Sequence, residues 1–363
     1  DQIWGSISSA DVDLDGLLDF AVASKSGHLY LFDINGLKFD YNAERWLIGT
    51  PVIGNIDSDP ELEIVVGSYQ SPTSSAPLFA VNHDGSDVSG YPYVLGEKIK
   101  SGVAIADMDD NGIDDIIFGT DGDNLYVLMD DLTIAPGFPV DLGNNVRSEP
   151  AILDLGDEKI IFSGCQNDNF YAINFSDASL RFIIATGDDV FGSASFYEDS
   201  SGVGIFFGSD DGNVYGVDID GNNLDGFPLN ISSGGIVGSV MFSDLNNDGF
   251  DDILIASPAA GISEPGEVYV VYGKSSVFAP SFDLSELALS GHTDGFVISG
   301  NDVEDRIGNV SSAGDINGDG YDDLVRVTMG KNRRAIETAL GGQTGLGSFV
   351  LLSGQAGTSA YNP

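Results

Sequence analysis

Oxygen-bearing side chains recur in this 363-residue chain at alternate positions of one nine-residue pattern, DxDxDGxxD. The clear copies are DVDLDGLLD (11–19), DMDDNGIDD (107–115), DLNNDGFDD (244–252) and DINGDGYDD (315–323), and NIDSDPELE (55–63) keeps oxygens at the same offsets. Oxygens at alternate positions of a tight, glycine-turned loop form a cage for a hard divalent cation. Calcium takes about 6–8 oxygen ligands and tolerates irregular geometry. The pattern therefore predicts about five calcium sites.

In each copy, the first, third, fifth and ninth residues are expected to bind the ion through side chains, and the seventh through its main-chain carbonyl. Gly16 permits the turn in the first copy, whereas Pro60 stands at the glycine position of the second. The expected ligands are Asp11, Asp13, Asp15, Leu17 and Asp19; Asn55, Asp57, Asp59, Glu61 and Glu63; Asp107, Asp109, Asn111, Ile113 and Asp115; Asp244, Asn246, Asp248, Phe250 and Asp252; and Asp315, Asn317, Asp319, Tyr321 and Asp323.

Two other interpretations compete for these loops. An EF-hand needs a bidentate glutamate at position twelve and flanking helices. Position twelve here is Val22, Val66, Phe118, Ile255 or Arg326, inside an expected strand, which excludes an EF-hand. Acidic turns without metal are the second alternative, and it weighs most on the copy with Pro60.

The loops recur with a regular spacing. Aligned on its first position, the pattern or its remnant begins at Asp11, Asn55, Asp107, Asp154, Tyr197, Asp244 and Asp315. Most separations fit the spacing of about 40–50 residues expected for four-stranded propeller blades. The repeats at Asp154 and Tyr197 keep a turn but lose most ligands.

After each anchor comes an apolar run, such as EIVVGS or IIFGT, expected to be a strand buried on both faces. In most repeats an alternating segment around an aromatic residue follows, such as HLYLFDI, expected to be half-buried. The fold class expected is all-β, a single seven-bladed β-propeller over residues 1–363, with blades near 3–50, 51–100, 101–147, 148–190, 191–236, 237–306 and 307–363. A linear row of β-sandwich domains is the alternative, although such domains usually need about 100 residues.

Charge and cysteine content limit the partners and the cellular location that can be expected. The chain has 57 acidic and 14 basic residues, for a formal net charge of −43, and this field excludes nucleic-acid partners. Cys165 is the only cysteine, so no intrachain disulfide can form. No apolar run reaches about 18 residues, so membrane insertion is not expected. Weak calcium loops need roughly 0.1–1 mM calcium, a level found outside cells, so an extracellular or cell-surface location is expected.

The chain resembles FG-GAP repeats, the calcium-loop blades of integrin α-subunit propellers and of many bacterial surface proteins. The resemblance is strongest in VGSVMFSDLNNDGFDDILIASP (237–258), GEVYVVYGK (266–274) and RIGNVSSAGDINGDGYDDLVRV (306–327). Val237-Gly238 and Ile307-Gly308 stand where Phe-Gly would be, and Ser257-Pro258 stands near the Gly-Ala-Pro turn. The insertion 275–305 is similar to spacers of bacterial members. The resemblance implies a seven-bladed propeller, calcium binding and an extracellular setting, but no particular ligand.

The sequence contains few residues whose pattern indicates catalysis. His28, His83 and His292 are scattered, Cys165 follows an apolar strand, and the carboxylate pairs belong to the loops. We therefore expect a non-enzymatic, calcium-stabilised propeller for extracellular recognition or adhesion, a module of a secreted or cell-surface protein. Its expected partner is an extracellular protein or glycan. A structural subunit of an extracellular filament or larger assembly is one alternative, and a polysaccharide lyase or glycoside hydrolase using the central depression is another.

Overall fold

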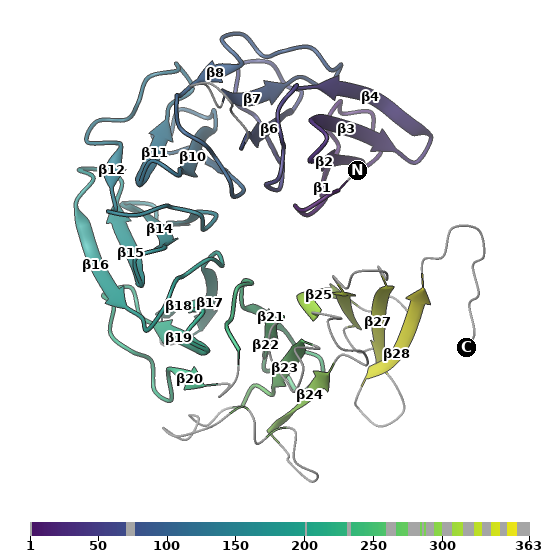
Figure 1. Cartoon of the computed structure of the whole chain (residues 1–363), viewed down its shortest axis with the longest axis vertical. Coiled ribbons are helices and arrows are strands. Elements are labelled where there is room, and N and C mark those ends of the chain that lie inside the picture. The colour runs from purple at the N-terminus through teal and green to yellow at the C-terminus, as the bar shows by residue number, and fades with distance from the viewer. Residues whose placement is uncertain are drawn as a thin grey trace. The chain divides into compact units, whose positions relative to one another are not determined.

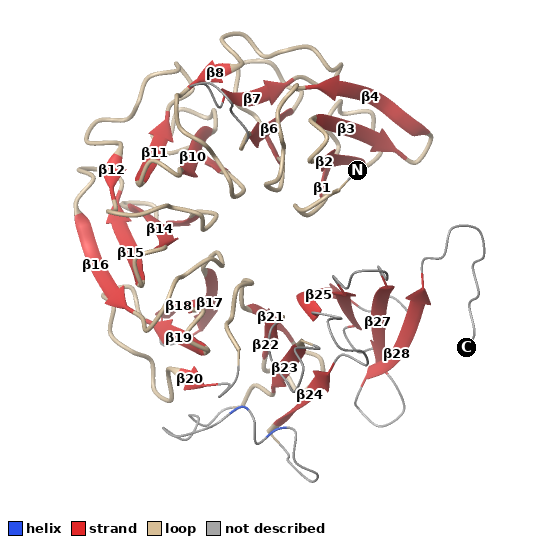
Figure 2. Cartoon of the chain, in the orientation of Figure 1, coloured by secondary structure: helices blue, strands red, loops and turns tan. Residues whose placement is uncertain are grey.

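The computed structural model describes residues 2–69, 77–199, 202–230, 234–258, 266–274, 284, 287, 294–299, 307–314, 323–328, 335–341 and 347–353. From residue 307 onward it describes the backbone course only. The described residues contain no α-helix, and the short blue segments in Figure 2 are 3-10 positions at 284 and 287. The all-β expectation is therefore confirmed, and every described strand belongs to a four-stranded antiparallel sheet.

The chain divides into two compact units, residues 1–185 and 186–363. Unit 1 contains four sheets, each with its strands in chain order (Figure 1). Their strands are β1 (Ser8–Ala10), β2 (Asp19–Ala23), β3 (His28–Asp33) and β4 (Gly36–Asn42); β5 (Val52–Gly54), β6 (Glu63–Gly67), β7 (Pro77–Val81) and β8 (Tyr93–Val94); β9 (Ala104–Ala106), β10 (Asp115–Gly119), β11 (Asn124–Leu128) and β12 (Val140–Asp141); and β13 (Ala151–Asp154), β14 (Lys159–Cys165), β15 (Asn169–Asn174) and β16 (Leu180–Ala185).

Unit 2 contains three sheets of the same strand order. Their strands are β17 (Ser195–Asp199), β18 (Gly202–Gly208), β19 (Asn213–Val217) and β20 (Leu229–Asn230); β21 (Met241–Ser243), β22 (Asp252–Ser257), β23 (Glu267–Val271) and β24 (Gly295–Ser299); and β25 (Ile307–Gly314), β26 (Asp323–Thr328), β27 (Ala335–Gly341) and β28 (Gly347–Ser353).

The second strand of each sheet is apolar throughout because it contributes to two cores. In β6, Ile64 and Val66 pack with residues of β2 and β3, while Val65 between them packs with residues of β10 and β11. In β10, Ile117 packs in turn toward β14 and β15. Consecutive sheets of unit 1 therefore stack face to face in series. An isolated sandwich would give β6 only one core, so the alternative of sandwich domains is wrong for unit 1.

The third strands are more buried than their alternating pattern suggested. The half-buried expectation holds for β3 and β19, which alternate buried and partly exposed residues. It is wrong for β11, β15 and β23, where four successive residues are buried. Aromatic rings explain part of the difference, since Tyr126 stacks on Phe118 and Tyr171 joins the core of β14.

Glycines let the first strands of neighbouring sheets approach closely. Within unit 1, β1 contacts β5, β5 contacts β9, and β9 contacts β13. A Cβ atom at Gly5 would lie 2.5 Å from the carbonyl oxygen of Gly49, and one at Gly49 would collide with the carbonyl oxygen of Ser101. Backbone atoms form these obstacles, so they cannot rotate away.

Gly49→Ala should therefore destabilise the protein by about 1–3 kcal/mol, the usual cost of overpacking. Chemical denaturation monitored by tryptophan fluorescence would measure the change. Ser9→Ala, at an exposed position of β1, should stay within about 0.5 kcal/mol of the wild type. Equal effects of the two substitutions would contradict the close approach.

Glu149, just before β13, places its carboxylate against Gly102, and burial raises the pKa of Glu149 to about 7. Because the folded-state pKa lies above the ordinary value of 4.5, the folded state holds the proton more tightly than the unfolded state. The free energy of unfolding then falls as pH rises from about 4.5 to about 7.

Glu149→Gln should raise the melting temperature at about pH 8 and leave it nearly unchanged at about pH 4. Glu44→Gln removes the same charge from an exposed side chain and serves as the control. A pH-independent effect of Glu149→Gln would show that packing, and not ionisation, governs this position.

Candidate metal-binding loops

The ninth residue of each described loop is a fully buried acid that begins the second strand of its sheet. Asp19, Glu63, Asp115 and Asp252 all have an exposed fraction of 0%. One carboxylate oxygen of each accepts a hydrogen bond of 2.9–3.1 Å from the backbone N–H of the second loop residue, which is Val12, Ile56, Met108 or Leu245. Burying a carboxylate costs free energy unless it is paired. Each loop therefore surrounds an acid that favours a cation or a proton.

The glycine at position six makes the turn that the sequence predicted. Gly16, Gly112 and Gly249 have φ values of 88° to 90°, a region that favours glycine. Their N–H groups donate to the carboxylate of the first loop residue at 2.8–3.0 Å. Pro60 has no N–H, so the second loop lacks this bond. The fifth and seventh residues are also linked, since the N–H of each seventh residue donates to the fifth side chain at 2.8–3.2 Å.

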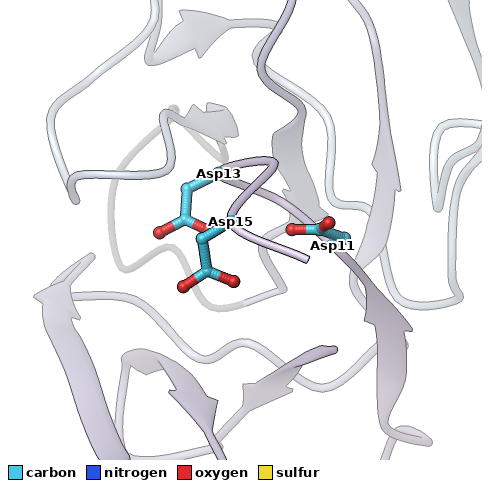
Figure 3. Close-up of side chains that lie close together, drawn as sticks. All are labelled: Asp11, Asp13 and Asp15. Carbon is cyan, nitrogen blue, oxygen red and sulfur yellow. The ribbon is translucent and has the colours of Figure 1, made fainter. Parts of the chain in front are cut away.

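Three of the described loops gather acidic oxygens within 4.8 Å of one another. The groups are Asp11, Asp13 and Asp15 in the first loop (Figure 3), Asp57, Asp59 and Glu63 in the second, and Asp107, Asp109 and Asp115 in the third. Asp244, Asp248 and Asp252 do not form such a group, although their loop has the same backbone hydrogen bonds. The second loop, least regular in sequence, thus gathers its acids better than the fourth copy at 244–252.

Several buried oxygens in the first two loops accept no hydrogen bond. These atoms are Oδ1 of Asp11, Asp13 and Asn55 and Oε1 of Glu63, and all four residues are predicted ligands. A buried polar atom without a partner is costly. Carboxylate and amide oxygens without softer nitrogen or sulfur donors match the preference of calcium. The residues present therefore fit a hard cation.

Burial raises the pKa values of the ninth-position acids Glu63, Asp115 and Asp252. The pKa of Glu63 rises to about 7 and that of Asp115 to about 6, first because burial disfavours the charged form, and then because neighbouring loop carboxylates repel it. The pKa of Asp252 rises to about 7 for the same reasons. Backbone N–H groups act in the opposite direction, but their effect is smaller than that of burial. A bound dication would remove both penalties.

Lys38 supplies a cation to the first loop from within the chain. Its Nζ lies 2.6 Å from Oδ1 of Asp19, 2.8 Å from Oδ2 of Asp13 and 3.9 Å from Oδ2 of Asp15. These carboxylates raise the pKa of Lys38, against the opposing effect of burial. The sequence analysis missed Lys38 because β4, which carries it, has no fixed distance from the loop along the chain.

Lys159 replaces the ninth-position acid in the repeat that begins at Asp154, which has lost most of its loop ligands. In β14, Lys159 pairs with Asp154 at the register position where Asp115 pairs with Ala106. Its Nζ donates to the carbonyl oxygen of Asp107 at 2.8 Å and also contacts Asp110. The buried base of one sheet thus holds the loop of the preceding sheet. Alignment of strand starts could have identified it from the sequence.

The first three loops are also joined by backbone contacts. The N–H of Leu62 donates to the carbonyl oxygen of Val12 at 2.9 Å. Asp114 and Asn55 exchange two bonds, one from the N–H of Asp114 to the Asn55 carbonyl at 2.7 Å and one from the Asn55 N–H to the Asp114 carboxylate at 3.1 Å. Ordering one loop therefore supports its neighbour.

The predicted ligands of the last copy lie mostly outside the described residues. Asp315, Asn317, Asp319 and Tyr321 lie outside the described residues, and Asp323 begins β26. Likewise, the insertion 275–305 is mostly outside the described part of the chain.

Lys38→Met should strengthen calcium binding at the first loop by about three- to tenfold, because the competing ammonium is gone. The same change should destabilise the calcium-free protein by about 1–3 kcal/mol, since Asp13 and Asp19 lose their partner. Isothermal titration calorimetry and melting with chelator measure the two effects. Lys98→Met, an exposed position away from the loops, is the charge-matched control. Weaker binding in Lys38→Met would contradict the competition.

Comparison with known proteins identifies the repeat and the fold. The FG-GAP repeat family model matches residues 237–271. No curated protein matches the chain. Among solved structures, BBS1N in complex with ARL6DN has a TM-score of 0.56 at 14% identity, over 90% of this chain and 89% of that one. BamB from Moraxella catarrhalis has a TM-score of 0.54 at 14% identity, over 89% and 93%.

These structural neighbours are propeller-like, and at this identity they show the fold alone. In the described residues, no helix is long and apolar enough to cross a membrane. The sequence match and the four-stranded sheets agree, since residues 237–271 run from just before β21 to the end of β23. The chain thus carries an FG-GAP repeat and is FG-GAP-like.

Proposed function

We propose that this chain is a seven-bladed, calcium-stabilised β-propeller that serves extracellular recognition or adhesion as a module of a secreted or cell-surface protein. The observation that carries the calcium part is the set of buried, unpartnered oxygens on Asp11, Asp13, Asn55 and Glu63. Each belongs to a residue that the repeat pattern designates as a ligand. Acidic turns without metal would instead turn these oxygens to solvent.

In this proposal the bound ions are structural. At about 1 mM calcium and a dissociation constant of about 0.1–1 mM, each site contributes roughly 0.4–1.4 kcal/mol by mass action. Five sites would then give roughly 2–7 kcal/mol, comparable with a typical domain stability of about 5–15 kcal/mol. This dependence suits a location with millimolar calcium, which supports the extracellular assignment.

The recognition part of the proposal rests on the connecting segments, which vary between repeats. The stacked sheets form a rigid scaffold, and binding residues favour loops on such scaffolds. An FG-GAP repeat and propeller-like neighbours support a binding module over an enzyme. The proposed partner is an extracellular glycan or protein, and a glycan and matrix-protein array with calcium or chelator tests this directly. Binding that chelator does not affect would count against a calcium-dependent module.

Glu63→Gln gives two opposite signatures that only a metal ligand should show. Without calcium, the variant should melt at a higher temperature than the wild type at about pH 8, because a buried carboxylate is neutralised. With about 1 mM calcium, it should gain about 0.4–1.4 kcal/mol less stability than the wild type.

Asp157→Asn is the matched control, since it removes one charge from an exposed turn in the repeat that lacks a loop. Its response to calcium should equal that of the wild type. If wild-type melting is the same with calcium and with chelator, the calcium proposal is wrong.

A further inference from the structure

Among the described lysines, three have no carboxylate partner, and all three lie in one place. Lys38, Lys159 and Lys274 form ion pairs with aspartates. Lys25, Lys98 and Lys100 form none with the described residues and instead lie over aromatic rings. In a chain with 57 acidic residues against 14 basic ones, unpaired ammonium groups are unexpected. Their clustering indicates a surface suited to an anion.

The rings and lysines make a continuous surface of unit 1. The Nζ of Lys25 lies 4.2 Å from the ring centroid of Trp4 and 4.7 Å from that of Trp46. Trp46 stacks on Tyr69 with centroids 6.5 Å apart and planes at 21°. We name it the aromatic–lysine surface, and it consists of Trp4, Lys25, Trp46, Tyr69, Lys98 and Lys100.

This surface lies at the end of the sheets opposite the candidate metal loops. The metal loops connect first to second strands, whereas Lys25 lies in the turn from β2 to β3. Trp46 lies in the connection from β4 to β5, and Lys98 and Lys100 lie in that from β8 to β9. Successive strands of each sheet run antiparallel. The connections from second to third strands and those between sheets therefore lie at the end of the strands opposite the metal loops. Calcium and a ligand would therefore not compete for space.

The fold does not dictate these side chains. One backbone hydrogen bond recurs at this end of the sheets. The N–H of a residue one or two positions after the second strand donates to a carbonyl oxygen in the segment that precedes the first strand of the same sheet. It joins Lys25 to Gln2, Tyr69 to Trp46 and Asp121 to Lys98, and in the fourth sheet it joins Gln166 to Asn145. In unit 2 it joins Asp210 to Asp189. The bond is kept while the side chains change from cationic and aromatic to neutral and acidic.

We propose that the aromatic–lysine surface binds an anionic polysaccharide, with sugar rings packing against the exposed parts of the indoles and sulfate or carboxylate groups meeting the lysines. This inference rests on the proposed recognition function and names its ligand class. Trp4 and Trp46 are 55% and 36% exposed, so part of each indole beside Lys25 is open to a ligand. A neutral glycan would leave the ammonium groups unused.

Two acids next to these lysines, Asp121 and Glu97, are already engaged. Both carboxylate oxygens of Asp121 pair with Arg147, at 2.6 and 3.0 Å. Glu97 accepts bonds from Thr120, Asn124 and Tyr126. Arg147 lies near Lys100, and burial followed by repulsion from Arg147 lowers the pKa of Lys100. An anionic ligand would relieve that repulsion.

The test measures binding of the whole chain to dextran sulfate, carboxymethyl dextran and neutral dextran of equal length in about 1 mM calcium. The wild type should bind the two anionic polymers and not the neutral one. Trp4→Ala, and separately the double variant Lys98→Gln/Lys100→Gln, should each weaken binding by about tenfold or more. Added salt should weaken binding, because screening acts on exposed charges.

The double variant Arg181→Gln/Lys274→Gln removes the same charge away from this surface and should bind within about twofold of the wild type. Melting of every variant with and without calcium, on the same samples, checks folding. Equal binding of neutral dextran, no binding of either anionic polymer, or equal loss in both double variants would overturn the proposal. A normal calcium response without polymer binding rejects this surface alone, whereas no calcium response rejects the proposed calcium function.

Discussion

A buried acid at the start of the second strand is the constraint on which each metal loop depends. Asp19, Glu63, Asp115 and Asp252 are fully buried where the apolar core begins. Each uses one oxygen to close its loop through the N–H of the second residue. The same residue thus ends the loop, begins the strand and carries a charge that the core disfavours. A cation held by the remaining oxygens would neutralise this charge and let the same residue both end the loop and begin the buried strand.

Two lysines show that the fold needs positive charge at these places. Lys38 reaches the acids of the first loop, and Lys159 stands where the fourth sheet has lost its acid and contacts the third loop. These are different solutions to one electrostatic problem. In the proposed function a dication serves the loops that keep their ligands, whereas in the fourth sheet the buried ammonium of Lys159 stands in place of the acid. The sheets of unit 1 can therefore stack in series although the fourth lacks a loop.

Local pattern predicted the strands and the loop turns well. The apolar runs at β6, β10 and β14 are buried along their whole length because each meets a sheet on both faces. Positive φ at Gly16 and Gly112 follows from the nine-residue pattern alone. Contacts between repeats could not be predicted in this way. Whether Asp114 bonds to Asn55, or Lys159 to Asp107, depends on how neighbouring sheets approach, and no spacing within one repeat contains that information.

The two ends of the sheets in unit 1 differ for a physical reason. At one end, the loop of the proposed function surrounds an ion, so coordination would fix its oxygens, and the turn requires its glycine. At the other end, a single backbone hydrogen bond, such as that from Tyr69 to Trp46, joins the connecting segments. Backbone bonding leaves the side chains free to vary. Aromatic and cationic residues can therefore collect at this end of an acidic chain without weakening the loops that stabilise it.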